Sequence, residues 1–327
     1  MTSDWKLTSV LRRAGSLKRS RLIGSPAFEG DIGAFKLLSN ETPVSLEHPS
    51  GRSMSVLPGD IFLATPGHRE STRWVVGGVP KEGLLPDKEY SILSSCGIVG
   101  ELVGSSSQRK SPLGKVEFLG TLGSNKANLR DFSAISEEES ADKGAELYLI
   151  VGTSAEVGKT TAGLTILRSL LHQGYSKIAV LKATGTSSIV ELLTYRDFGA
   201  FATLDCVDFG LPTTYPSERS DISPIFDRAI RYMLGLPAQA VLIECGGDIL
   251  GANVPIFLER LKKTRPVDKL VLAAPDSLAA FGGLRILEKM GFTPDLLTGP
   301  CTDTPTLLER TQKLCGVNAM NMLGPRP

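Results

Sequence analysis

The chain has 327 residues, of which 41% are hydrophobic and 22% charged, and its formal net charge at pH 7 is +1. This composition is typical of a soluble globular protein long enough for two domains, and its net charge gives no support for a nucleic-acid partner. No apolar run approaches the ~20 residues that span a bilayer, and no two of the five cysteines form a C-x-x-C pair. We therefore expect a cytoplasmic protein with reduced thiols and with neither a nucleic-acid nor a membrane partner.

Residues 1–22 are polar and basic. Their charge is compatible with an organelle-targeting peptide, but a loose basic tail or a first helix is the favoured interpretation. Residues 133–145 are acidic and small, with Glu137, Glu138 and Glu139 in a row. That stretch predicts an interdomain linker.

Between these segments, residues 23–132 contain short apolar stretches separated by Gly, Pro and Ser. The stretches are 32–37, 61–64, 73–76, 98–103 and 116–119. Such spacing predicts a small all-β domain, either a barrel or a sandwich. Its loop 65–73 is dense in polar groups, which suits either a ligand-binding loop or an exposed hairpin tip.

From residue 146 to 327 the pattern changes to alternating strands and helices. The expected strands are 147–151, 177–181, 240–244, 270–274 and 295–298, and the expected helices after the first are 222–234, 255–263, 278–290 and 304–314. This alternation predicts a mostly parallel α/β sheet with helices on both faces. Because ligands bind such sheets at the carboxyl ends of the strands, the residues that follow each strand are the candidate site.

The first of these strands leads into a phosphate-binding loop. Its residues are Gly152, Thr153, Ser154, Ala155, Glu156, Val157 and Gly158, and the helix after it opens with Lys159, Thr160 and Thr161. Backbone N–H groups and the helix dipole favour an anion there. Lys159 can reach the outer phosphates, and the Thr160 hydroxyl can sit on Mg²⁺. We therefore expect a nucleoside triphosphate, most simply ATP, as the ligand.

Two further strand ends carry charged residues. Lys182 follows the second strand, where it can hold an anion. Glu244 ends the apolar third strand, and a carboxylate there is costly to bury unless it is paired or bound to a metal. Gly246 and Gly247, which follow it, would let backbone approach phosphates or substrate. We predict Thr160 and Glu244 as Mg²⁺ ligands.

The loop is one residue longer than the usual G-x-x-x-x-G-K-[ST], and its G-T-x-x-E-V-G-K-T pattern resembles the nucleotide loop of dethiobiotin synthetase. The resemblance covers about residues 146–324. It implies an ATP- and Mg²⁺-dependent carboxylase-type ligase that forms a homodimer. It also implies that Lys182 contacts the substrate carbamate and the nucleotide phosphate, and that Glu244 binds metal.

The resemblance extends to two further positions. Asp197 lies at nearly the offset of that family's metal-binding aspartate, with Asp205 and Asp208 as competitors. Asp303 lies in the loop that holds the nucleotide base in similar enzymes, although it could equally cap the last helix. Residues 184–186 and 197–200 also resemble a P-loop family that includes D-glutamate N-acetyltransferases.

Together these features predict an ATP-dependent ligase or carboxylase that activates a small-molecule carboxylate or carbamate for attack by an amine, with Lys159 and Lys182 as catalytic residues. Two alternatives stay open. One is a nucleotide-driven regulatory ATPase whose β domain binds a partner. The other is an acyltransferase that uses the phosphate loop to hold a nucleotide-containing acyl donor.

Overall fold

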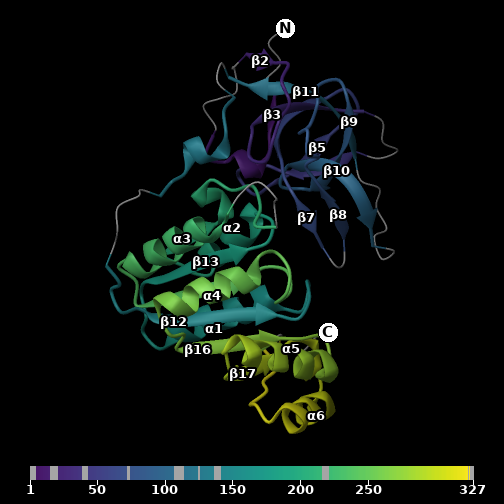
Figure 1. Cartoon of the computed structure of the whole chain (residues 1–327). Helices are drawn as coiled ribbons and strands as arrows, with labels where there is room; N and C mark the ends of the chain where they lie inside the picture. Colours follow the sequence, from purple (N-terminus) through teal and green to yellow (C-terminus); the bar gives the residue numbers. More distant parts are fainter. Residues whose placement is uncertain are drawn as a thin grey trace. The chain divides into compact units, whose positions relative to one another are not determined.

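The structure, a computed structural model, describes residues 5–14, 21–38, 43–71, 74–106, 114–123, 126–135, 141–215, 221–322 and 324. The chain divides into two compact units (Figure 1). The first unit comprises Met1–Ser136, Thr186–Val190 and Cys206–Glu218, and the second comprises Glu137–Gly185, Glu191–Asp205 and Arg219–Pro327. Two short segments of the expected 146–327 domain are therefore part of the first unit, which the sequence did not predict. Residues 136–140 of the expected linker lie outside the described residues.

The first unit is a mixed β structure. Its strands are β1 (Lys6–Leu7), β2 (Leu22–Ile23), β3 (Gly33–Leu37), β4 (Val44–Glu47), β5 (Ser53–Val56), β6 (Ile61–Pro66), β7 (Arg69–Glu70), β8 (Val75–Gly78), β9 (Glu89–Ser94), β10 (Ile98–Ser105) and β11 (Lys115–Leu122). Strands β6, β3, β11, β9 and β10 pair in that order, and β10 returns to β6, so the strands close on themselves. An odd number of strands cannot close through antiparallel pairs alone, and β10 and β6 form the parallel pair of this ring. The barrel form of the β prediction is confirmed.

Aromatic side chains fill the inside of this barrel. Phe35, Phe62 and Phe118 are fully buried. The ring centroids of Phe35 and Phe118 lie 5.1 Å apart, and those of Phe35 and Phe62 lie 6.2 Å apart. Such pairs add about 1 kcal/mol each beyond the area they bury. They come from three neighbouring strands, which explains why short apolar stretches suffice to form a core.

Part of the expected basic tail is integrated into the first unit. Leu7 lies in β1, which pairs in parallel with β6, and Val10 and Leu11 are buried in the 3₁₀ helix η1 (Ser9–Leu11). Arg12 and Arg13 form ion pairs with the buried carboxylate of Asp208, at 2.8 and 2.6 Å. Residues 5–14 are thus not a loose tail, because Arg12 and Arg13 are paired with a carboxylate and the apolar side chains pack. Residues 1–4 and 15–20 lie outside the described residues.

A buried glutamate of the first unit binds the segment Thr186–Val190. Glu47 accepts hydrogen bonds from the Ser188 hydroxyl at 2.9 Å and from the backbone N–H groups of Ile189 and Val190 at 3.1 and 3.3 Å. The Ser9 hydroxyl also donates to this carboxylate. Free N–H groups at a helix start need acceptors, so Glu47 acts as the cap of the helix that begins at Ile189.

The second unit is the predicted α/β domain. Its strands are β12 (Glu146–Gly152), β13 (Ile178–Thr184), β14 (Ala202–Asp205), β15 (Ala240–Cys245), β16 (Lys269–Ala273) and β17 (Leu296–Thr298). Its helices are α1 (Lys159–His172), α2 (Ile189–Asp197), α3 (Ser223–Gly235), α4 (Val254–Thr264), α5 (Ser277–Met290) and α6 (Pro305–Cys315), and the first two residues of α2 belong to the first unit. Within the described residues these strands form one parallel sheet in the order β14-β13-β15-β12-β16-β17. The sequence missed β14 and α2.

Apolar stripes hold the helices on the sheet. Ile166, Leu167 and Leu170 of α1 recur at helical spacing and pack in one cluster with Ile150 of β12 and with Tyr195 of α2. Helices α3 and α4 contact each other and strand β13. Local signals set the helix ends: the Asp276 side chain caps α5, and Gly291 and Gly316 end α5 and α6 in left-handed conformations. None of the helices in the described ranges is long and apolar enough to span a bilayer.

Candidate phosphate-binding site

The phosphate loop, residues 152–158, connects the central strand β12 to helix α1. A Cβ atom on Gly152 would lie 2.9 Å from Cδ of Lys159 and from Cγ2 of Val157, so only glycine fits there. Glu156 and Gly158 have φ values of +60° and +88°, which turn the chain sharply into the helix. The Thr153 N–H donates to Ala273 O at 3.0 Å and fixes the loop on β16. The loop is therefore built as the sequence predicted.

Lys159 lies folded inside this loop. Its ammonium group donates to the carbonyl oxygens of Ser154 and Gly247, both at 2.7 Å. Burial lowers the pKa of Lys159 to about 8, against the opposing effect of Glu244. Carbonyl oxygens are weaker partners for an ammonium group than phosphate oxygens. A bound polyphosphate could therefore replace both acceptors and restore the full charge of Lys159.

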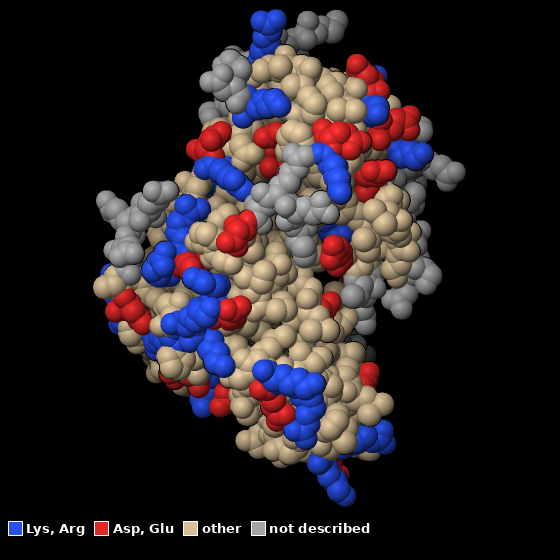
Figure 2. Space-filling model, in the orientation of Figure 1, with Lys and Arg blue, Asp and Glu red and all other residues tan. Residues whose placement is uncertain are grey.

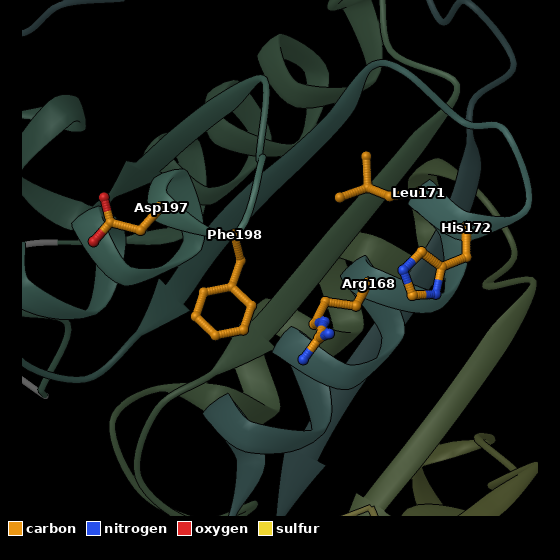
Figure 3. A pocket seen from close by; sticks show the side chains of 5 residues that line it. All are labelled: Arg168, Leu171, His172, Asp197 and Phe198. Carbon is orange, nitrogen blue, oxygen red and sulfur yellow. The ribbon is translucent and has the colours of Figure 1, made fainter.

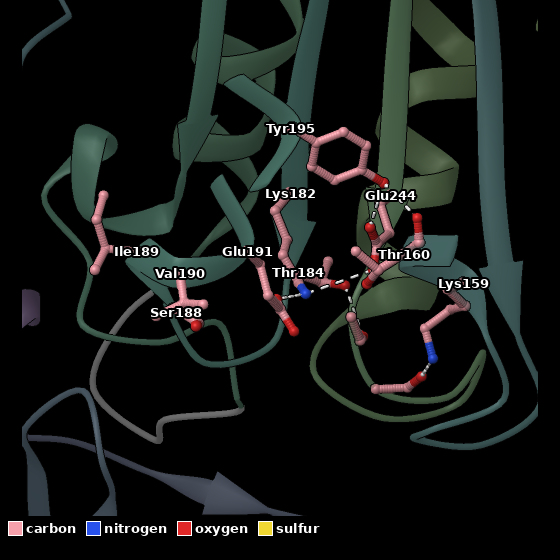
Figure 4. A network of polar contacts seen from close by, with 12 residues as sticks. Lys159, Thr160, Lys182, Thr184, Ser188, Ile189, Val190, Glu191, Tyr195 and Glu244 are labelled. Atoms are coloured by element: carbon pink, nitrogen blue, oxygen red, sulfur yellow. Dashed lines mark hydrogen bonds and ion pairs between the residues drawn. The ribbon is translucent and has the colours of Figure 1, made fainter. Parts of the chain in front are cut away.

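Thr160 and Glu244 meet beside the loop. The Thr160 hydroxyl donates to Oε1 of Glu244 at 2.9 Å, and Glu244 is 1% exposed at the end of β15 (Figure 4). Burial raises the pKa of Glu244, but Lys182, Tyr195, Lys159 and Thr160 together outweigh it and hold that pKa below its usual value. The carboxylate is therefore ionised near neutral pH. The predicted pair of Thr160 and Glu244 is brought together by the fold.

Lys182 lies between two carboxylates. The register of the sheet places it opposite Glu244, and its ammonium nitrogen is 3.4 Å from Oε1 of that residue. Its second partner is Glu191 of helix α2, with which it forms a close ion pair. Sequence reasoning predicted Lys182 and missed Glu191, because the segment around Glu191 was not assigned to a helix.

Tyr195 is the second residue of α2 that the sequence did not reveal. Its side chain is fully buried, and its hydroxyl donates to Oε2 of Glu244 at 2.8 Å. Burial and the neighbouring carboxylate raise the pKa of Tyr195 well above its ordinary value, so it stays a hydrogen-bond donor. Glu191 and Tyr195 are four residues apart and so share one face of the helix. That spacing was the available sequence signal.

The structure does not bring Asp197 to this group. Asp197 is exposed in the last turn of α2 and lines a pocket with Arg168, Leu171, His172 and Phe198 (Figure 3). The alternative Asp208 pairs with Arg12 and Arg13 in the first unit. Asp205 stands opposite Lys182 in the register of β13 and β14. The metal-binding role expected for Asp197 is thus unsupported, and Tyr195, two residues earlier, is the α2 side chain that reaches Glu244.

Gly246 and Gly247 have different surroundings. Gly246 exchanges backbone and side-chain hydrogen bonds with Thr184, and a Cβ there would lie 2.3 Å from Thr184 O. Gly246 therefore joins two strands, whereas Gly247 offers its carbonyl to Lys159. At the loop after β17, a Cβ on Gly299 would lie 2.8 Å from Val157 O, so this loop lies against the phosphate loop. Asp303 follows in it, and its predicted contact with a base stays a prediction.

A parallel sheet with a glycine-bounded loop, an inward lysine and a hydroxyl–carboxylate pair defines the second unit as a P-loop nucleotide-binding fold. The sequence matches no known protein family and no curated protein. Similar solved structures are the signal recognition particle 54 kDa protein of Aeropyrum pernix K1 in complex with GDP, at 16% identity and a TM-score of 0.38; the receptor FtsY of Elizabethkingia anophelis in complex with GDP, at 15% and 0.35; and chloroplast FtsY of Physcomitrella patens, at 14% and 0.39.

These matches cover 59%, 51% and 58% of this chain, respectively. They cover 46%, 52% and 62% of the other chains, so the chain spans about half the length of the first two.

Proposed function

We propose that this protein is a Mg²⁺-dependent enzyme that binds a nucleoside triphosphate and transfers its γ-phosphoryl group to a carboxylate or carbamate of a small molecule. The observation that carries the proposal is the hydrogen bond of 2.9 Å between Thr160 and the buried, ionised Glu244, directly after the lysine of the phosphate loop. An apolar pair of similar size would fill this buried position at least as well, so packing alone does not explain a carboxylate beside a hydroxyl here.

The residues present fit a magnesium ion. A hydroxyl and an ionised carboxylate are oxygen donors, and Mg²⁺ in such sites takes few protein ligands because phosphates and waters complete its shell. Thr160 and Glu244 would hold the ion. Bound there, it would neutralise charge on the β- and γ-phosphates.

The lysines supply the remaining positive charge. We expect Lys159 to leave the carbonyls of Ser154 and Gly247 for phosphate oxygens, and Lys182 to face the transferring group from the neighbouring strand end. An oxygen of the substrate carboxylate would attack the γ-phosphorus, the bond to the bridging oxygen would break, and the nucleoside diphosphate would leave. An amine would then open the acyl phosphate and release inorganic phosphate and a proton.

The substrate class rests on two supports. The loop 152–160 and Lys182 resemble dethiobiotin synthetase, whose chemistry activates a carbamate. On the face shown in Figure 2, acidic and basic side chains are interspersed, and the net charge of the chain is +1. On that face the described residues show no broad basic field for a polyanionic partner. A small molecule is therefore the favoured substrate.

A second candidate function, a nucleotide-driven switch, is favoured by one observation. The segments Thr186–Val190 and Cys206–Glu218 follow the carboxyl ends of strands β13 and β14, the end of the sheet at which Lys182 lies. Both segments nevertheless belong to the first compact unit. The chain therefore runs from the carboxyl ends of β13 and β14 straight into segments of the β unit, and a nucleotide-driven switch would need a connection of this kind. Stimulation of hydrolysis by a protein, without any small-molecule acceptor, would favour this reading over the enzyme.

Calorimetry with ATP and with GTP, each with and without Mg²⁺, tests the proposal. We expect micromolar binding, about −8 kcal/mol, for at least one nucleotide. Lys159→Met should lose most of this affinity, whereas Lys313→Met, which changes an exposed lysine of α6, should keep it. Release of nucleoside diphosphate should then depend on an added carboxylate. Failure of the wild-type protein to bind either nucleotide would overturn the proposal.

A further inference from the structure

We propose that Tyr195 is a positioning residue that orients the Glu244 carboxylate toward the metal site, and that Gly163 of helix α1 is glycine to make room for it. The inference rests on the proposed function, because it assigns Glu244 to Mg²⁺. It goes further in naming a residue outside the phosphate loop and the strand ends that determines how well the ion is held.

The two oxygens of Glu244 have different partners. Oε1 accepts from the Thr160 hydroxyl at 2.9 Å and lies 3.4 Å from the Lys182 ammonium, whereas Oε2 accepts from Tyr195 at 2.8 Å. The Tyr195 bond therefore fixes the rotation of the carboxylate and keeps Oε1 on the side of Thr160 (Figure 4). Partners of this kind, which hold a metal ligand without touching the metal, commonly change metal affinity by 10–100-fold when removed.

Helix α1 is shaped around the same hydroxyl. A Cβ on Gly163 would lie 1.9 Å from the Tyr195 hydroxyl oxygen and 2.9 Å from Cζ of its ring. Glycine inside a helix destabilises it relative to alanine. Gly163 nevertheless lies inside α1, one turn after Thr160, where the absence of a side chain leaves space for the Tyr195 hydroxyl. The hydroxyl also lies 3.5 Å from the Thr160 carbonyl, so it stands between both metal-site residues.

A purely structural role of the Tyr195 hydroxyl predicts a different result. A buried hydroxyl that only satisfies a hydrogen bond would contribute to the free energy of unfolding and would leave metal binding unchanged. A positioning role changes the Mg²⁺ dependence specifically. It leaves nucleotide binding in the absence of Mg²⁺ as it was, because the Tyr195 hydroxyl donates to Glu244 and lies near the Thr160 carbonyl, whereas the Lys159 ammonium group donates to Ser154 and Gly247.

The test compares Tyr195→Phe with Tyr148→Phe. Tyr148 is a matched control, because its hydroxyl also donates to a glutamate, Glu146, at 3.0 Å, but at the start of β12 and away from the phosphate loop. Nucleotide affinity is measured in EDTA and at rising Mg²⁺. We expect Tyr195→Phe to raise the half-saturating Mg²⁺ concentration about tenfold or more, with affinity in EDTA within twofold of wild type. Tyr148→Phe should match wild type in both.

Gly163→Ala provides a second, independent variant. Its methyl group displaces the hydroxyl, so we expect the same loss of Mg²⁺ affinity. In the Tyr195→Phe background the closest clash is gone, and the added alanine should cost much less than it does alone. This non-additivity is the signature of two residues that act through one contact.

The outcomes separate the two proposals. If wild-type protein binds no nucleotide, the proposed function fails and this inference falls with it. If wild type and Tyr195→Phe bind Mg²⁺ and nucleotide equally well, the proposed function stands and the positioning role is wrong. Unfolding of Tyr195→Phe, with Tyr148→Phe folded by circular dichroism, would show that the hydroxyl serves the fold and would equally overturn the inference.

Discussion

The hydroxyl of Thr160 lies 2.9 Å from Oε1 of Glu244, although the two residues are 84 positions apart in the chain. Parallel pairing of β12 and β15 brings them together. The register places Ile150 opposite Glu244, so the phosphate loop that follows β12 starts at the same end of the sheet as Glu244. A hydrogen-bonded hydroxyl and carboxylate at this edge form a pair that a hard divalent cation could bridge.

Removing the charge of Glu244 should therefore abolish the effect of Mg²⁺ while keeping the phosphate loop intact. We expect Glu244→Gln to bind nucleotide in EDTA about as well as wild type, and to gain little affinity when Mg²⁺ is added. Thr160→Ser should retain the Mg²⁺ effect and Thr160→Val should lose it, because only serine keeps the hydroxyl. Calorimetry with and without Mg²⁺ measures all four proteins. Equal Mg²⁺ effects in wild type and Glu244→Gln would remove this carboxylate from the metal site.

The depressed pKa of Lys159 predicts a pH dependence of nucleotide binding. In the free protein, burial lowers that pKa to about 8, and phosphate oxygens in the complex should raise it again. Above pH 8 the complex then holds a proton that the free protein has lost. Binding should take up close to one proton, and the dissociation constant should rise up to tenfold per pH unit.

Calorimetry in two buffers of different ionisation enthalpy measures this proton uptake directly. Lys159→Met is the control, since it has no titrating group at that position and should show weak binding that does not change between pH 8 and 9. Wild-type affinity that stays constant over the same range would contradict a pKa near 8 for Lys159.

Lys182 and Glu191 offer a matched pair of variants on the acid side. Lys182 is the nearest cation to the buried Glu244 carboxylate and the strongest influence that lowers its pKa. Lys182→Met should therefore raise the pKa of Glu244, and Mg²⁺-dependent binding should be lost at a higher pH than in wild type when the pH is lowered. Glu191→Gln keeps the Lys182 ammonium group beside Glu244, so it should lose Mg²⁺-dependent binding at the same pH as wild type. A titration of the Mg²⁺ effect from pH 5 to 8 distinguishes them; identical profiles for both variants would argue against control by Lys182.

The parts of the site that sequence could predict are those whose signals are local. Gly152, Gly158, Lys159 and Thr160 lie within nine consecutive residues, and their spacing alone specifies a loop between a strand and a helix. Glu244 was accessible for a similar reason, because a single carboxylate at the end of an apolar strand is conspicuous. In each case the residue and its structural context lie close together in the chain.

Helix α2 was missed although a local signal for its start, Ser188 followed three residues later by Glu191, is present in the sequence. In the structure a distant residue holds the helix start instead, because its first N–H groups are bound by Glu47, which lies 142 positions before Ile189. The contacts of Tyr195 and Glu191 with Glu244 and Lys182 depend on that helix. A distant partner also explains the amino-terminal segment: Arg12 and Arg13 read as a solvated charge run, because Asp208, their partner, is 196 and 195 positions away.

A substitution of Asp197 distinguishes the role implied by the family resemblance from the role that its position in the structure indicates. Resemblance to dethiobiotin synthetase makes Asp197 a metal ligand, whereas the structure leaves it exposed at the end of α2 beside Arg168 and His172. We therefore expect Asp197→Asn to bind nucleotide and Mg²⁺ within about twofold of wild type, because a surface carboxylate contributes little. The measurement is the Mg²⁺ titration used for Glu244→Gln, which serves as the positive control. A loss of Mg²⁺ affinity in Asp197→Asn comparable to that in Glu244→Gln would mean that α2 rearranges when the ligand binds, so that Asp197 replaces Tyr195 at the metal site.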